Sequence, residues 1–215
     1  RLEELYLGDT PITDAGLAQL AGLPNLIHLS LANTQVTDAG LKHLARLKRL
    51  KILQLNETKV TGAGLAELAG LQGLQQLILG TETTDEGLQH LPKFQELQLL
   101  WLFDSRITDA GLAHLAGLPA LKELSLQNAP ITDAGLKHLL PLENLKGLLL
   151  RGTPITDAGL VHLRALKKLR GLDLNGTQVT PQGLADFQQA MPGCEIVDGP
   201  WLTRRTKPVR NAPGL

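Results

Sequence analysis

The stretch that decides the fold runs from Leu97 to Ala120 and reads L-Q-L-L-W-L-F-D-S-R-I-T-D-A-G-L-A-H-L-A-G-L-P-A. Its leucines, its T-D-A-G-L turn and its closing A-G-L-P recur along the chain, whereas L-W-L-F at positions 100–103 occurs once. We therefore expect the recurring residues to build a scaffold, and the unique ones to mark what that scaffold binds.

Comparison of the chain with itself finds eight such units. Each follows L-x-x-L-x-L-x-x-T-x-[IV]-T-D-A-G-L-x-x-L-x-x-L-x-x with local substitutions, and the spacing is 24 residues except for 23 between Leu74 and Leu97. The units start at Leu2, Leu26, Leu50, Leu74, Leu97, Leu121, Leu145 and Leu169. A fixed period of this length is typical of a repeat architecture, in which each unit stacks on its neighbours.

Within each unit, the spacing of the leucines predicts one strand and one short helix. Leucine alternates with other residues in L-x-L, which is the period of a strand buried on one face. Leu112, Leu115 and Leu118 recur every three residues, which suits a short, tightly wound helix. Thr or Asp before A-G-L is a helix start signal, because its side-chain oxygen can accept a backbone N–H.

The unit resembles the leucine-rich repeat family, specifically the bacterial and F-box-associated type with a G-L-x-x-L helix, over about residues 2–193. The resemblance implies an α/β leucine-rich-repeat solenoid (horseshoe), with a parallel sheet on the concave face and short helices on the convex face. It also implies a function in protein–protein contact. Many members carry an Asn, bonded to backbone between neighbouring coils, at a position where this chain has a column of threonines. The column comprises Thr10, Thr34, Thr58, Thr153 and Thr177.

We expect a single domain, residues 1–198, made of the eight repeats and a C-terminal cap strand at about 194–197. Trp201 follows that cap and is available to cover exposed leucines. Residues 199–215 carry four basic residues and no acid, so we expect a basic, flexible tail. The first unit would expose its apolar edge and strand backbone, which favours further residues upstream of Arg1.

Composition argues against several classes of function. The chain has 21 basic and 21 acidic residues, and without the basic tail its body is mildly acidic, so nothing favours nucleic-acid binding. No run approaches the ~20 apolar residues of a membrane span, and no signal-peptide pattern opens the chain. The single cysteine, Cys194, excludes an internal disulfide. We expect a monomer without a cofactor.

Repeat four departs from the pattern immediately before the unusual strand. Its loop from Leu79 to Asp85 is one residue short, and Phe94 replaces a helix leucine. We expect a local distortion of the coil; a functional role for the short loop is the alternative.

Two columns of polar side chains invite a metal or catalytic interpretation, which we reject. Adjacent helices lie about 8–10 Å apart, whereas two imidazoles on one Zn²⁺ need bonds of about 2 Å each. The aspartates sit at helix N-termini, where capping and the helix dipole explain them. The columns are His43, His90, His114, His138 and His162, and Asp14, Asp38, Asp109, Asp133 and Asp157. Without a nucleophile–base set or a phosphate loop, we expect no catalytic, metal-binding or cofactor-binding residues.

The variable positions beside the strand leucines point into the concavity of such a fold. Large apolar residues concentrate there in the middle repeats, and Trp101 and Phe103 stand on one strand at solvent-facing positions. An apolar centre with a polar rim is the anatomy of a protein-binding patch, and Trp is enriched at hot spots. The predicted partner-binding residues are Trp101, Phe103, Leu99, Ile78, Ile52 and Leu149 in the centre, and Asn56, Asp104, Gln127 and Arg151 in the rim.

The sequence therefore favours a non-catalytic module that binds a protein or peptide through its concave face. Three alternatives stay open. Trp101 and Phe103 could merely fill the groove left by small neighbours such as Gly80 and Ser125. The chain could be a structural or spacer segment of a larger multidomain protein. It could also bind carbohydrate through Trp101 and nearby polar residues, since aromatic rings stack on sugars.

Overall fold

The computed structural model describes residues 2–201. In this part of the chain nine strands form one parallel sheet in which spatial order equals sequence order. The register advances by one repeat at each step, so that Leu5 pairs with Leu29 and Leu29 with Leu53. The strands are β1 (Glu4–Tyr6), β2 (His28–Ser30), β3 (Ile52–Gln54), β4 (Gln76–Leu79), β5 (Leu99–Leu102), β6 (Glu123–Ser125), β7 (Gly147–Leu149), β8 (Gly171–Asp173) and β9 (Glu195–Ile196).

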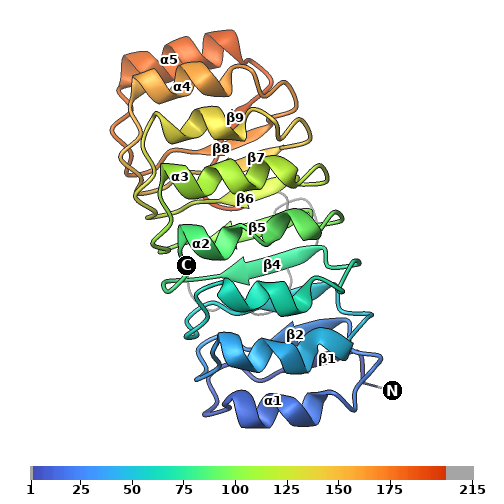
Figure 1. The fold of residues 1–215 in the computed structure, drawn as a ribbon. Helices are drawn as coiled ribbons and strands as arrows, with labels where there is room; N and C mark the ends of the chain where they lie inside the picture. The colour runs from blue at the N-terminus through green and yellow to red at the C-terminus, as the bar shows by residue number, and fades with distance from the viewer. Residues whose placement is uncertain (1, 202–215) are drawn as a thin grey trace.

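One or two short helices follow each strand from β1 to β8 and stack along one side of the array, with the strands behind them in Figure 1. Many are 3-10 helices, as expected from leucines spaced three residues apart. The helices are α1 (Asp14–Leu20), η1 (Asp38–Arg46), η2 (Ala63–Leu68), α2 (Asp85–Leu88), η3 (Leu91–Lys93), α3 (Asp109–Leu112), η4 (Ala113–Gly117), η5 (Gly135–Leu139), α4 (Asp157–Leu163) and α5 (Pro181–Ala190). The predicted leucine-rich-repeat solenoid is confirmed.

A continuous leucine core lies between the sheet and the helices. The middle leucine of each strand from β2 to β8 is fully buried, as are the helix leucines that face it. Phe94 fills the place of a helix leucine in repeat four, and Phe187 fills the core under α5. A single strand and helix cannot bury its own apolar face, so each coil depends on its neighbours for stability.

The turn after the strand has a left-handed backbone in every repeat but the fourth. At this position φ lies between 52° and 69° in seven repeats, where Asp, Asn, Glu or Gly is found. These residues are Asp9, Asn33, Glu57, Asp104, Asn128, Gly152 and Gly176. In repeat four, no residue from Leu79 to Asp85 has a positive φ, so the missing residue is the left-handed one. The expected distortion of that coil is therefore a change of turn type.

The aspartates of T-D-A-G have a different role from the one predicted. Threonine caps the helix, because in η1 the Thr37 hydroxyl accepts the amide of Ala39. The Asp carboxylate instead reaches the next repeat: Asp14 accepts the amide and hydroxyl of Thr37, at 2.9 and 2.7 Å. At Asp157 the same bonds, made by Thr180, lower the pKa of the carboxyl. Capping by Asp was thus wrong, and these residues join neighbouring coils.

This Asp–Thr ladder links six of the seven junctions between the eight repeats in residues 2–201. The pairs are Asp14–Thr37, Asp38–Thr61, Asp85–Thr108, Asp109–Thr132, Asp133–Thr156 and Asp157–Thr180. The exception is the junction of repeats three and four, where Gly62 replaces Asp. There the amide of Thr84 bonds the carbonyl of Thr61 instead, at 3.1 Å.

The column of threonines in the strand-to-helix turn bonds within its own repeat. Each hydroxyl donates to the leucine carbonyl three residues earlier, as from Thr34 to Leu31 at 2.7 Å. Thr10, Thr58, Thr153 and Thr177 make the same bond. A hydroxyl also carries acceptor lone pairs, and at Thr58 it accepts the amide of Val60, at 3.3 Å.

The array ends with β9, which pairs with β8, after which the chain turns back onto the sheet. Trp201 lies against Gly147 and Gly171 on the face opposite the leucine core, rather than over exposed leucines. The predicted flexibility of the basic tail concerns residues 199–215, of which 202–215 lie outside the described residues.

Candidate binding surface on the concave face

Two residues of each strand from β1 to β8, and one of β9, face away from the leucine core, and together they form the concave face. The pairing register places them in two columns, of which the first crosses all nine strands and the second crosses β1 to β8. The first column is Glu4, His28, Ile52, Gln76, Leu99, Glu123, Gly147, Gly171 and Glu195, and the second is Tyr6, Ser30, Gln54, Ile78, Trp101, Ser125, Leu149 and Asp173.

Trp101 and Phe103 lie side by side on this face and are both half-buried. Their ring centroids are 6.5 Å apart and the ring planes are tilted by 58°. The indole Nε1 of Trp101 donates to Oε1 of Glu123 on the neighbouring strand, at 3.1 Å. This hydrogen bond fixes the orientation of the indole.

The other predicted apolar residues are less accessible than expected. Ile52 is half-buried, whereas Ile78, Leu99 and Leu149 are buried. The accessible apolar centre in this structure is therefore Trp101 and Phe103 with Ile52, and the buried residues support it from the sides.

The predicted rim residues are held in place by partners. Asp104 is exposed and accepts the side-chain amide of Asn128, at 2.8 Å. Exposed Arg151 bonds Asp198 at 3.1 Å, which links the rim to the C-terminal segment. Gln127 is half-buried, and Asn56 is buried.

Three residues of this face were not selected from the sequence. Glu123 and Asp173 are fully buried carboxylates, and Trp201 is 8% exposed. The sequence feature that indicates a contact here is the pair Gly147 and Gly171. These glycines leave space in the first column, where a large side chain such as that of Trp201 can lie across the strands. The C-terminal half of the concave face is thus already in contact with the chain's own end.

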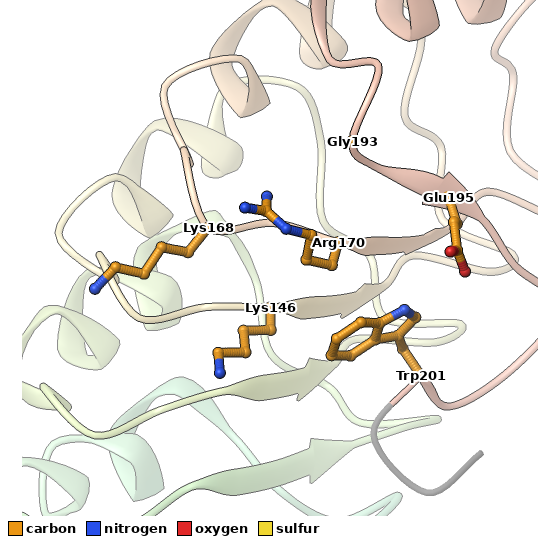
Figure 2. Close-up of a pocket in the computed structure, with 6 residues that line it drawn as sticks. All are labelled: Lys146, Lys168, Arg170, Gly193, Glu195 and Trp201. Atoms are coloured by element: carbon orange, nitrogen blue, oxygen red, sulfur yellow. The ribbon is translucent and has the colours of Figure 1, made fainter. Parts of the chain in front are cut away.

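Beside Trp201 the surface is hollowed into an open pocket of about 390 Å³. Figure 2 shows Lys146 and Lys168 on one side of the indole and Glu195 on the other, with Arg170 above the ring. The pocket lining is mostly basic, and it gives this end of the face a charge opposite to that of Glu123 and Asp173.

A second cluster lies at the N-terminal end of the face. The Tyr6 hydroxyl donates to Glu4 at 2.8 Å and lies 3.1 Å from Nδ1 of His28, whose ring it meets edge-on at 4.8 Å between centroids. Burial lowers the pKa of His28, although the charge of Glu4 opposes this shift. Burial and then the bond to Glu4 raise the pKa of Tyr6. The Tyr6 hydroxyl thus bridges Glu4 and Nδ1 of His28, whereas Nε2 of His28 is buried and has no hydrogen-bond partner among the described residues.

Comparisons with protein-family models and with solved structures support this fold. Family models described as Leucine Rich repeats (2 copies) and Leucine Rich repeat match residues 1–44 and 118–140. The chain carries leucine-rich repeats and folds as a leucine-rich-repeat solenoid. Comparison with curated proteins gave no match.

Two solved structures of internalins from Listeria monocytogenes are similar to this repeat array. Internalin C2 is 27% identical, with 90% of this chain and 79% of that chain covered and a TM-score of 0.67. A second internalin, inlF, is 22% identical, covers 96% and 72% of the two chains, and has a TM-score of 0.62, which shows a common fold.

The five column histidines are half-buried on the helix side, and residues 2–201 hold no group of three or more His, Cys, Asp or Glu able to bind a metal ion. Burial raises the pKa of Cys194 to about 11, while Arg170 opposes the rise and Glu195 adds to it, so the thiolate form is disfavoured at neutral pH. No helix in the described range is long and apolar enough to span a bilayer.

Proposed function

We propose that this protein is a non-catalytic interaction module that binds a protein or peptide through its concave face, with Trp101 as the central anchor. Its likeness to leucine-rich-repeat proteins supports a protein-interaction role in general. The observation that carries the specific proposal is a half-exposed indole on a sheet face, next to Phe103 and oriented by Glu123. Anchors of this kind dominate the binding energy of protein interfaces.

The carbohydrate hypothesis has less support. It needs several exposed polar side chains around the stacking ring. Asn56 is buried, and Asp104 is bonded to Asn128, so few free groups remain to bind sugar hydroxyls. A spacer function would leave Trp101 without an external ligand, and the following experiment addresses that outcome.

The test compares Trp101→Ala with wild type. A partner is captured from a lysate of the source organism and its affinity is then measured in purified form. We expect Trp101→Ala to weaken binding by about 2 kcal/mol or more, as for hot-spot tryptophans. It should lower the Tm only slightly, because the ring lies outside the leucine core and the indole is one of more than one group that interact with buried Glu123.

Two further variants sharpen the result. Val161→Ala removes an exposed apolar side chain from α4 on the opposite side and should leave binding unchanged. Trp101→Phe keeps an aromatic ring but loses the bond to Glu123, so an intermediate loss is expected. If Trp101→Ala lowers the Tm strongly, Trp101 is a structural residue. If neither a protein nor a glycan array gives binding, the spacer function replaces this one.

A further inference from the structure

A second tryptophan is buried on the concave face, away from the Trp101 patch. Trp201 is only 8% exposed, yet it belongs to no part of the leucine core, because it lies on the other side of the sheet. Phe187, Met191 and Cys194, which precede it, do belong to that core. Trp201 therefore packs on the concave surface of the sheet, and not in the interior.

The seat is made by two glycines. A Cβ at Gly171 would lie 2.2 Å from Cδ1 of Trp201, and a Cβ at Gly147 would lie 3.3 Å from its Cβ. A side chain on Gly171 would therefore occupy the place of the indole. In the first column the strands β1 to β6 all carry larger side chains, so a flat floor for a ring exists only at β7 and β8.

A buried carboxylate beside this floor recognises backbone. Oδ2 of Asp173 accepts the amide of Gly199 at 2.9 Å, and its Oδ1 accepts the amide of Asn175 at 3.0 Å. Asp173 is fully buried, so the loss of the Gly199 amide would leave a desolvated acceptor, which is costly. A ring floor next to a buried acceptor for a main-chain N–H is suited to an extended peptide with one aromatic residue.

We propose that the floor of Gly147 and Gly171 with Asp173 is a peptide-binding site for an aromatic residue on an extended segment, and that Gly199–Trp201 occupies it in cis as an exchangeable latch. The segment before it is held by short and exposed contacts. The strand β9 has two residues, the amide of Val197 bonds the carbonyl of Leu172 at 2.9 Å, and exposed Asp198 accepts from Arg151 and Asn175 at 3.1 and 3.0 Å. Exposed ion pairs of this kind add little stability.

The latch lies next to the patch of Trp101 and Phe103, but the proposal of a peptide site does not depend on binding at that patch. Glu123 connects them, because its Oε1 accepts the indole of Trp101 while its Oε2 would lie 3.1 Å from a Cβ at Gly147, next to Trp201. Release of the segment would thus enlarge the accessible surface from Trp101 toward β8. A peptide could still bind the glycine floor if Trp101 bound nothing, so the two hypotheses fail separately.

The test uses the full chain with Trp201→Ala and a fluorescent peptide with the sequence of residues 196–205. We expect the peptide to bind the variant at least about tenfold more tightly than wild type, because in wild type the tethered segment competes at an effective concentration in the millimolar range. The same peptide with Trp replaced by Ala should not bind. Adding Gly171→Ala to the variant should abolish binding, since the new methyl occupies the ring position.

Gly193→Ala is the matched control, because a Cβ there meets nothing closer than 4.0 Å; combined with Trp201→Ala it should leave peptide binding intact. Equal binding to wild type and Trp201→Ala, or binding that ignores Gly171→Ala or the peptide's Trp, would overturn the proposal. So would an absence of binding to any variant.

Hydrogen exchange of the wild-type chain gives an independent measurement, should Trp201→Ala not fold. Millimolar peptide should displace the latch and accelerate exchange of the Gly199 amide. The amide of Leu150, bonded to the carbonyl of Asp173 in the sheet, should not change. If both amides keep their rates at saturating peptide, the segment is a fixed part of the fold and the latch does not exist.

Discussion

The Asp–Thr ladder and the concave face differ in how much their residues vary from repeat to repeat. Along the ladder nearly every repeat has the same two residues, and their polar groups bond one another across the junctions. Across the concave face each repeat has different residues, from Glu4 and Tyr6 at one end to Asp173 at the other. The ladder holds the coils together, which leaves the face free to vary.

The one break in the ladder supports this division. At Gly62 the carboxylate is absent and φ is 99°, and Gly87 of the next repeat lies so close that a Cβ on Gly62 would be 2.8 Å from its Cα. The coils of repeats three and four are therefore in contact through their backbones, and not through a carboxylate. The short turn of repeat four and the strand of Trp101 follow directly, so the irregular part of the ladder lies beside the part of the face with the aromatic pair.

The largest effect that we expect tests the ladder. The carboxylate of Asp38 accepts the amide and hydroxyl of Thr61, at 3.0 and 2.7 Å, and the amides of Gly62 and Gly64, at 3.2 and 2.8 Å. Since hydrogen bonds to a charged group contribute about 1.5–3 kcal/mol each at best and this site is partly exposed, Asp38→Ala should lower the free energy of unfolding by about 3 kcal/mol. Urea denaturation measures it.

Asp186→Ala is the control for this substitution. Asp186 is exposed on α5 and bonds only Gln182, four residues away in the same helix, so its loss should cost about 0.5 kcal/mol or less. Peptide or partner binding at Trp101 should be the same in Asp38→Ala as in wild type wherever the chain is folded. A stable Asp38→Ala with impaired binding would reverse the roles that we assign to the two surfaces.

The second effect tests why glycine follows the ladder residues. A Cβ on Gly135 would lie 2.2 Å from Oδ1 of Asp109. This oxygen accepts the amide of Thr132, and Oδ2 of the same carboxylate accepts the Thr132 hydroxyl. Gly135→Ala should therefore displace the carboxylate and cost about 1–3 kcal/mol, although alanine favours helix by about 1 kcal/mol. Thermal denaturation should show the loss.

Gly73→Ala provides the contrast for this prediction, because a Cβ there meets no atom within 4 Å. Its Tm should not fall. If Gly135→Ala also leaves the Tm unchanged, the glycine column serves some purpose other than room for the carboxylate.

The period of 24 residues was sufficient to predict the strands, the helices and the leucine core, because each rests on a local spacing. The partner of each Asp is Thr 23 residues later, and this offset is visible only once the coils are stacked. The burial of Ile78 and Leu149 could not be predicted for a related reason. Alignment of the repeats assigns the same exposure to every residue of a column, whatever its neighbours are. The contact of Gly199 with Asp173 lies outside any repeat, so periodicity could not reveal it.

The smallest effect concerns a place where the core itself departs from the repeat. Thr83 stands where other repeats have Ile or Val, as at Val60, and is fully buried with no hydrogen-bond partner for its hydroxyl among the described residues. Thr83→Val replaces this hydroxyl by a methyl group of similar size, so it should raise the free energy of unfolding by about 1 kcal/mol. Thr34→Val should do the opposite, because its equally buried hydroxyl donates to the carbonyl of Leu31. Opposite signs in the two Tm shifts would show that repeat four gives up stability at its short turn, and a loss in both would mean that Thr83 has a hydrogen-bond partner in solution.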